Sequence, residues 1–449
     1  MEKTITSKFI DSMWEFSQKS VSKKIIEEVK CCLIDYIACA NIGATLLEKQ
    51  DSAFSSAFGS AMGNCSVVGS DKKVNVLVAA MLNGLDSHWI ELDDGQRYAM
   101  LHLGAPVISA MLAVSQDKNL SAVQFIRGVV VGYEATVRIA SAIQPGHKLK
   151  WYHATGTCGT IGTSIGIAAA LEYGKDKWNT VISCAATDAA GLLQMIDDGS
   201  ELKPYNVGRA AVAAINAAYM GATGLTGPGD PLGGKRGFFA ATADEVKEKY
   251  LLEGFGEKLA IETIYRKPYA ACRHCHAPIE ATLNIINQNK IDIDTISKIV
   301  VDTYGLAVKG HEHTEIDGAG SAKMSTPYAV AAAIVFGKVS YQEYEDRCLG
   351  DVKVHSLMEK VSVVENTELS KLAPAKRVAI VTIVTDNGTF DSRVDYPLGE
   401  PENPISYEAL KEKYFSLMNA SGRSQEYMDS LIGCIENLEA EFSKFLSII

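Results

Sequence analysis

Three stretches of this chain are rich in alanine and apolar on most faces, at residues 162–173, 209–221 and 328–337. Alanine has the highest helix propensity and lets helices approach closely, so each stretch predicts a helix buried among other helices. Residues 22–40 place apolar side chains at the i, i+3, i+4, i+7 spacing of an amphipathic helix. A chain of 449 residues usually exceeds one core, so we expect two domains.

A different pattern begins later in the chain. Residues 296–303 are a short run rich in β-branched side chains, and residues 377–385 alternate β-branched side chains on one face. Asn387 and Gly388 come next, followed by residues 389–394. An Asn-Gly pair between two such runs is the strongest local sign of a β-hairpin. This part of the chain therefore predicts strands as well as helices.

These patterns predict a mainly α protein with an inserted α+β domain. Residues 1–262 and 406–449 are expected to form one helical domain from both ends of the chain. Residues 263–405 are expected to form a smaller α+β domain, with a helical pattern near residues 277–287 between its strands. No internal repeat or low-complexity tract interrupts this organisation.

Charge and composition exclude several classes of partner. The formal net charge of −11 opposes binding to nucleic acid or to an anionic membrane surface. No apolar run approaches the roughly 20 residues that span a bilayer, and the start has no signal-peptide core. The ten scattered cysteines suit a reducing compartment. A cytoplasmic location is expected, and an anionic substrate would need a local basic cluster.

The first candidate site segment contains His88, Glu91, Asp93 and Asp94, and His102 follows shortly after. Acid–base chemistry places a carboxylate near an imidazole, since each group tunes the pKa of the other. The alternative is a capping role, in which Asp93 or Asp94 accepts the free backbone N–H groups of the next helix. Both interpretations are open from the sequence.

His153 marks the second candidate segment. It precedes the Gly- and Thr-rich residues 154–160, which open an alanine-rich helix. Small residues let the backbone approach a ligand, and the N-terminus of a helix favours a carboxylate. The alternative is tight helix packing, with His153 as a capping residue.

Residues 229–236 come close to a phosphate-binding loop but fail its requirements. Arg236 replaces the Ser or Thr that the motif needs for magnesium, and the preceding segment has a helical pattern where the motif needs a strand. No dinucleotide-binding glycine fingerprint follows a strand in the first domain. We therefore expect no nucleotide cofactor.

A basic segment lies just before a predicted helix. Arg266, Lys267 and Arg273 are fixed cations, and His274 and His276 add two imidazoles. Such a cluster supplies the local positive field that an anionic substrate requires. The alternative without a functional role is a solvated basic loop.

The same segment raises the possibility of zinc. Cys272 and Cys275 have the spacing of a ligand pair, and His274 and His276 lie beside them. A structural zinc site generally needs a second ligand pair at a distance, which only His311 and His313 could supply, at an atypical spacing.

Six segments of the chain together resemble the MmgE/PrpD family, which includes 2-methylcitrate dehydratase, cis-aconitate decarboxylase and iminodisuccinate epimerase. Each motif is weak by itself, but six in the family's order are specific. They are His88-x-x-Glu91-Leu92-Asp93-Asp94, residues 101–106, residues 153–156, Lys203-Pro204 ahead of residues 208–211, residues 267–276, and residues 322–330. Gly95 and Leu103 stand where relatives often carry threonine and proline, and these departures leave the substrate open.

The resemblance implies a helical domain plus an α+β lid domain, a homodimer, and an active site between the domains. It implies a lyase, or an isomerase or epimerase, that acts on a small di- or tricarboxylate without metal or cofactor. The reaction would abstract a proton, or remove CO2, next to a carboxylate through an enediolate-like intermediate. Two alternatives remain, a non-catalytic carboxylate-binding protein and a zinc-binding protein that uses Cys272, Cys275, His274 and His276.

The resemblance also suggests roles for single residues. His102 and His153 would exchange the proton, and Tyr328 would donate a proton or hydrogen bond. Substrate carboxylates would be held by Lys203, Arg273 and His276. Orienting or binding roles fall to Glu91, Asp93, Asp94, His274 and Lys267. Cations around the developing charge and a base poised near neutral pH are what such chemistry requires.

Overall fold

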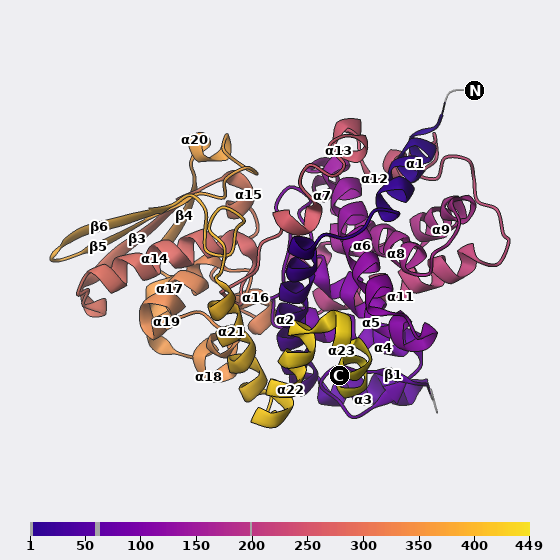
Figure 1. The fold of residues 1–449 in the computed structure, drawn as a ribbon. Coiled ribbons are helices and arrows are strands. Elements are labelled where there is room, and N and C mark those ends of the chain that lie inside the picture. The colour runs from indigo at the N-terminus through magenta and orange to yellow at the C-terminus, as the bar shows by residue number, and fades with distance from the viewer. Residues whose placement is uncertain (1–2, 59–62, 198–199) are drawn as a thin grey trace.

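The computed structural model describes residues 3–58, 63–197 and 200–449, and consists of a large helical part beside a smaller part with a sheet (Figure 1). The helical part begins with the following helices: α1 (Ile5–Ser17), α2 (Lys23–Leu46), α3 (Glu48–Ala57), α4 (Val76–Trp89), α5 (Gly104–Lys118), α6 (Ala122–Ile143), α7 (Gly146–Leu149), α8 (Ala154–Ala170), α9 (Lys175–Asp188), α10 (Gln194–Asp197), α11 (Lys203–Gly221), α12 (Phe238–Thr242) and α13 (Glu248–Leu252). A two-stranded ribbon of β1 (Cys65–Ser66) and β2 (Lys73–Val74) lies between α3 and α4.

Helix α8 is the centre of the helical part. Every residue of α8 is buried, and the helix packs against α6 and α11. Glycine makes the closest of these contacts possible. A Cβ atom on Gly166 of α8 would lie 2.5 Å from the carbonyl oxygen of Gly128 and 2.9 Å from Gly132 Cα, both on α6. The predicted burial of the alanine-rich helices is confirmed for this helix and for α11, which packs against α4 and α9.

Helix α2 is long and apolar enough on average to cross a membrane, although the sequence predicted no such segment. Its most apolar window has a mean hydropathy of 1.4, and 83% of that window is buried inside the protein. The helix packs against α4 and against the C-terminal helix α21 (Tyr407–Ala420). These contacts are those of a core helix.

The smaller part holds a four-stranded mixed sheet of order β4-β3-β5-β6. Strand β3 (Ile296–Thr303) runs parallel to β4 (Val361–Glu365) and antiparallel to β5 (Ala379–Thr385), which forms a hairpin with β6 (Gly388–Val394). The predicted hairpin is confirmed, since Thr385 pairs with Gly388 across the turn. Strand β4 was not predicted from the sequence.

Helices pack on the sheet. Helix α14 (His276–Gln288) contacts β5 and β6, and α17 (Thr326–Phe336) contacts α14 and β4 (Figure 1). The other short elements of this part are η2 (Arg273–Cys275), η3 (Ile293–Thr295), α15 (Gly305–Val308), α16 (Ala319–Ala322), η4 (Tyr341–Tyr344), α18 (Asp346–Leu349), α19 (Val352–Met358) and α20 (Thr367–Ser370). The short helix η1 (Ala260–Thr263) precedes them in the chain and packs on α2 and α6 of the helical part.

The chain then returns to the helical part. Helices α21, α22 (Gln425–Glu436) and α23 (Leu438–Ile448) follow the sheet, and they pack on α2 and α6 (Figure 1). Lys413 of α21 anchors this return because its Nζ donates to Asp35 Oδ1 at 2.6 Å and to the carbonyl oxygen of Lys267 at 2.9 Å. The mainly helical architecture with a small α+β part is thus as predicted.

Candidate active site

A cavity of about 660 Å³ lies where the helical part meets the α+β part. Residues before position 204 supply one wall, including Glu91, His102 and His153. Residues after position 264 supply the other. The remaining polar lining residues are Gln144, Lys148, Tyr152 and Lys203 on the helical wall, and Tyr265, Cys272, Arg273, His274, His311 and Arg377 on the α+β wall. The cavity is therefore rich in cations and imidazoles.

Glu91 is the one carboxylate among these lining residues, and it is paired with two lysines. Its Oε1 lies 2.5 Å from Lys203 Nζ and 2.9 Å from Lys267 Nζ. Burial raises the pKa of Glu91, but the charges of Lys203 and Lys267 outweigh it and hold the pKa well below the ordinary value. Glu91 is therefore ionised, and its backbone φ of +57° lies in the left-handed region, which non-glycine residues adopt uncommonly.

Asp93 organises two histidines behind Glu91. Both oxygens of Asp93 lie 2.9 Å from His88 Nδ1, and Oδ2 lies 3.3 Å from His102 Nδ1. The two imidazole rings meet edge to face at 4.4 Å. Burial raises the pKa of Asp93, but its contacts with the His88 and His102 rings lower the pKa well below the ordinary value. Asp93 thus positions imidazoles.

His102 faces the cavity as a neutral imidazole. Its Nδ1 donates to the backbone carbonyl of Asp94 at 2.7 Å, which leaves the lone pair on Nε2, 3.7 Å from Glu91 Oε1. Burial lowers the pKa of His102 to about 4, against the opposing charge of Asp93. His102 is thus uncharged at neutral pH, with an unprotonated Nε2.

Asp94 caps a helix. Its Oδ1 accepts the backbone N–H groups of Leu103 at 3.2 Å and Gly104 at 2.8 Å, where α5 begins. Its Oδ2 accepts a hydrogen bond from the Tyr133 hydroxyl at 2.8 Å, and burial raises its pKa to about 6. Asp94 is not among the residues that line the cavity. The helix cap therefore accounts for Asp94.

His153 carries a buried nitrogen without a protein partner. It stands immediately before α8 and is 6% exposed, and its Nδ1 has no hydrogen bond within the described part of the chain. Burial lowers its pKa well below the ordinary value, and the nearby charge of Lys203 lowers it further. Buried polar atoms are nearly always paired, so this unpaired nitrogen, on a residue that lines the cavity, is an exception that a functional role would explain.

Three cations besides Arg273 face the same space. Lys148 Nζ lies 3.3 Å from His274 Nε2, and burial lowers the pKa of Lys148. Arg377 donates to the carbonyl of Arg97 at 3.2 Å while it lines the cavity. Lys203 completes the set. Several fixed positive charges in one enclosed space favour an anion with more than one carboxylate.

Arg273 lines the cavity but is largely committed to the protein. Its guanidinium donates to Glu400 Oε1 at 3.0 Å and to the carbonyls of Leu398 and Pro397, both at 3.2 Å. It also contacts His276 Nδ1 at 2.9 Å. Arg273 therefore contributes positive charge to the cavity, but few of its N–H groups are free to bind a ligand.

His276 and Tyr328 lie outside the cavity lining, although the family resemblance suggests site roles for both. His276 is fully buried, and its second ring nitrogen donates to the carbonyl of Ala271 at 3.2 Å. The Tyr328 hydroxyl donates to the carbonyl of Glu343 at 2.6 Å. Both side chains start on buried helices, α14 and α17, and they point into the α+β core. Lys267 is also absent from the lining and acts through Glu91.

The four residues of the zinc alternative are not brought together. Cys275 Sγ lies 3.5 Å from Thr326 Oγ1, away from the cavity, and His276 is bonded to Arg273. Cys272 and His274 converge instead with His311, with their ligand atoms within 4.8 Å of one another. A second group, His88, Glu91 and His102, has a similar spacing. Lysines sit against both groups, which makes each one a poor site for a divalent cation.

Several cavity residues escaped the sequence interpretation. They are Lys148, Arg377 and Tyr265. The sequence had offered His311 only as a zinc ligand, and His88 only as part of the first segment, without its pairing to Asp93. Lys148 precedes His153 by five positions, which could have indicated a shared site. Arg377 and Tyr265 carried no local signal, because long-range folding brings them to the cavity.

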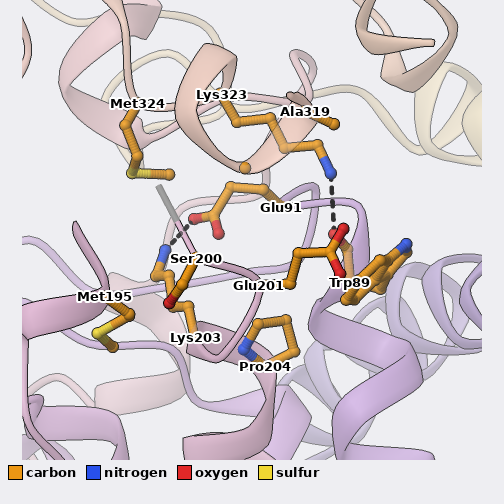
Figure 2. Close-up of a pocket in the computed structure, with 11 residues that line it drawn as sticks. Trp89, Glu91, Met195, Ser200, Glu201, Lys203, Pro204, Ala319, Lys323 and Met324 are labelled. Carbon is orange, nitrogen blue, oxygen red and sulfur yellow. Dashed lines mark hydrogen bonds and ion pairs between the residues drawn. The ribbon is translucent and has the colours of Figure 1, made fainter. Parts of the chain in front are cut away.

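A second cavity of about 550 Å³ adjoins the first, and the two share Glu91, Lys203 and Met324. Figure 2 shows the Glu91 carboxylate directed at Lys203, with Met195 and Trp89 among the apolar groups around them. Lys323 donates to the carbonyl of Trp89 at 3.0 Å, and burial lowers its pKa to about 8. The Glu91–Lys203 pair thus forms a partition between a polar cavity and a more apolar one.

A mainly helical part and a small α+β part enclose a basic, histidine-lined cavity. This arrangement defines an enzyme with a site for small anions. The chain belongs to the MmgE/PrpD family: the MmgE/PrpD N-terminal domain matches residues 9–250 and the C-terminal domain matches residues 269–436.

Curated relatives are similar along most or part of the chain. The cis-aconitate decarboxylase-like protein oryM of Aspergillus oryzae is 24% identical, over 100% of this chain and 98% of its own length. The human cis-aconitate decarboxylase is 23% identical, over 98% of this chain and 92% of its own. The 2-methylcitrate dehydratase of Salmonella typhimurium is 23% identical over only 53% of this chain and 52% of its own length.

Proposed function

We propose that the protein is a lyase that removes CO2 from a small unsaturated tricarboxylate of the cis-aconitate type. The observation that carries this proposal is the cavity, which combines Lys148, Lys203 and Arg377 with four imidazoles and a single, already paired carboxylate. The relatives that align with nearly the whole chain are named as cis-aconitate decarboxylases, whereas the dehydratases align with about half.

The geometry suits the charge changes of this reaction. When CO2 leaves, its bonding electron pair stays on carbon and spreads onto the remaining carboxylates as an enediolate-like anion. Lys148, Lys203 and Arg377 stabilise that anion, which water stabilises poorly. A proton must then reach the carbon, so that one CO2 leaves and one proton enters.

His102 and His153 act as bases in this scheme. Only the ionised carboxylate loses CO2, so a neutral imidazole that accepts the proton of the reacting carboxyl group prepares the substrate. Glu91, Asp93 and His88 hold the imidazoles and lysines in place. No step requires a metal or another cofactor.

Proton and carbon-13 NMR in D2O would test the proposal. The purified protein would be incubated with cis-aconitate, 2-methylcitrate and iminodisuccinate, each with and without EDTA. We expect loss of cis-aconitate, release of CO2 and one deuterium in the product, unchanged by EDTA. Loss of water, or deuterium exchange without CO2, would replace decarboxylation with the dehydratase or epimerase reaction. Inactivity toward all three acids would overturn the proposed substrate class.

A further inference from the structure

We propose that Cys272 and His311 form a second acid–base pair in the cavity, which delivers the proton to the carbon that has lost CO2. This inference rests on the proposed function and adds a catalytic group to it. Cys272 stands at the start of η2 and His311 in the loop after α15, so both come from the α+β part.

The geometry is that of an oriented thiol–imidazole pair. Cys272 Sγ lies 4.0 Å from His311 Nε2, and the other ring nitrogen of His311 donates to the carbonyl of Met324 at 2.7 Å. The backbone N–H of Cys272 donates to the carbonyl of Lys323 at 2.8 Å, which holds the backbone that carries the thiol. A nucleophile or acid, a base, and a group that orients the base are the parts of a proton-transferring dyad.

The surrounding charges keep one transferable proton within this pair. Burial raises the pKa of the Cys272 thiol, but the charge and hydrogen bond of His311 and the charge of Lys203 lower it to about 6, against Glu91. His274 lies beside the pair, and burial lowers its pKa well below the ordinary value, while Lys148 Nζ contacts its Nε2 at 3.3 Å. Near neutral pH the Cys272 thiol has therefore mainly lost its proton, and Nε2 of His311, 4.0 Å away, is positioned to hold it for transfer.

The proposed reaction needs such a donor. His102 and His153 are neutral bases on the helical wall, and the Tyr328 hydroxyl is committed to the carbonyl of Glu343. Cys272 and His311 face the cavity from the opposite wall. A substrate between the walls can lose its carboxyl proton to one side and receive a proton on carbon from the other. The imidazole then releases its extra proton to solvent and the pair recovers one from solvent, which balances the cycle.

The charges also argue against a metal ion held by Cys272, His274 and His311. Lys148 Nζ lies 3.3 Å from His274 Nε2, so a divalent cation bound there would sit beside a buried ammonium group. Repulsion between two such charges in a poorly solvated site is large. Proton transfer among the same three residues does not bring a divalent cation next to the Lys148 ammonium group.

Kinetics of Cys272→Ser test the role, with Cys275→Ser as the matched control. Cys275 belongs to the same segment, but its thiol faces Thr326 and lies outside the cavity lining. We expect Cys272→Ser to lower kcat at least a hundredfold with KM changed less than threefold, because a general acid acts in the transition state. The limb of the pH–kcat profile that reports the thiol should disappear. Cys275→Ser should keep wild-type kcat.

Alkylation of the wild-type enzyme gives a measurement that needs no variant to fold. Iodoacetamide at neutral pH should modify Cys272 at least tenfold faster than Cys275, as read by mass spectrometry of the peptides. Propane-1,2,3-tricarboxylate, a saturated tricarboxylate, should slow this modification. His311→Gln should remove the advantage of Cys272.

The outcomes separate this inference from the proposed function. If the wild type acts on no tricarboxylate, the proposed function fails. If the wild type releases CO2 but Cys272→Ser keeps its kcat and pH profile, only the assignment of the pair is overturned. Stoichiometric zinc in the wild type that is lost in Cys272→Ser would also overturn it.

Discussion

At the residue scale, the cavity concentrates positive charge in a protein whose formal net charge is −11. Glu91 offsets this by pairing with Lys203 and Lys267, so that the lysines stay in position when the site is free of substrate. A substrate carboxylate near Lys203 meets an ammonium group that is already held. Preorganised charges of this kind stabilise a transition state without reorganisation.

His153 offers the most direct test of the base. His153→Ala should lower kcat at least a hundredfold, because a positioned general base contributes about 10²–10⁴-fold. The melting temperature should change little, since Nδ1 of this ring makes no hydrogen bond within the described residues. His355→Ala is the control, because His355 lies on α19, outside the cavity lining. Near-wild-type kcat in His153→Ala would contradict the assignment.

The protonation state of His102 can be measured directly. Its pKa of about 4 keeps the ring neutral from alkaline pH down to about pH 5, whereas an ordinary histidine gains its proton near pH 6.5. The proton is therefore gained, and the base lost, only as the pH falls through about 4. NMR titration of histidine-labelled protein, with His102→Gln to assign the signal, should show no His102 transition between pH 8 and 5. A midpoint near 6.5 would contradict it.

At the element scale, glycine sets the distance between the helices that carry the site. Helix α8 begins next to His153, and its contact with α6 depends on Gly166 lying against Gly128 and Gly132. A Cβ atom on Gly159, on the same helix, would have its nearest neighbour 3.5 Å away, in the ring of Pro106. One helix thus offers a crowded glycine and an uncrowded one.

Gly166→Ala should therefore destabilise the protein by about 1–3 kcal/mol, because the added methyl group overpacks a close contact between backbones. Gly159→Ala should be neutral or slightly stabilising, since alanine favours helix where space allows. Thermal unfolding monitored by circular dichroism at 222 nm measures both variants. Equal melting temperatures for the two variants would show that the α6–α8 contact adjusts freely.

The periodic spacing of side chains in the sequence predicted those elements whose pattern is regular along their length. The alanine-rich α8 and the Asn387-Gly388 hairpin were both evident, because their signals are local. Strand β4 was missed because Val361–Glu365 is short, partly exposed at the edge of the sheet, and paired in parallel with the distant β3. Local sequence patterns do not indicate such long-range strand pairing.

At the scale of the whole molecule, the cavity exists only where two parts of the chain meet. The family motifs led to His102, His153 and Lys203, which do share one space. They could not show that His276 and Tyr328 point into the α+β core, because a motif fixes position along the chain but not the direction of a side chain. Arg377 and His311 reach the cavity through folding across more than a hundred residues from the helical wall. The expected boundaries near residues 262 and 405, and the homodimer, stay predictions.

A ligand that contacts both walls should stabilise the whole protein. Propane-1,2,3-tricarboxylate should raise the melting temperature, because binding to the folded state adds about 2.7 kcal/mol at one hundred times the Kd. Arg377→Met removes a cation from the α+β wall while the helical wall keeps Lys148 and Lys203. We expect this variant to lose at least half of the ligand-induced shift.

Arg393→Met supplies the control, since Arg393 lies on β6 and pairs with the partly exposed Asp395 at 2.8 Å. It removes the same charge from the same part of the molecule, so its ligand-induced shift should equal that of the wild type. High salt should reduce the shift in all three proteins, because screening weakens the attraction between a trianion and fixed cations. Equal shifts in Arg377→Met and Arg393→Met would mean that the α+β wall contributes no charge to binding, and the cavity would then act through its helical wall alone.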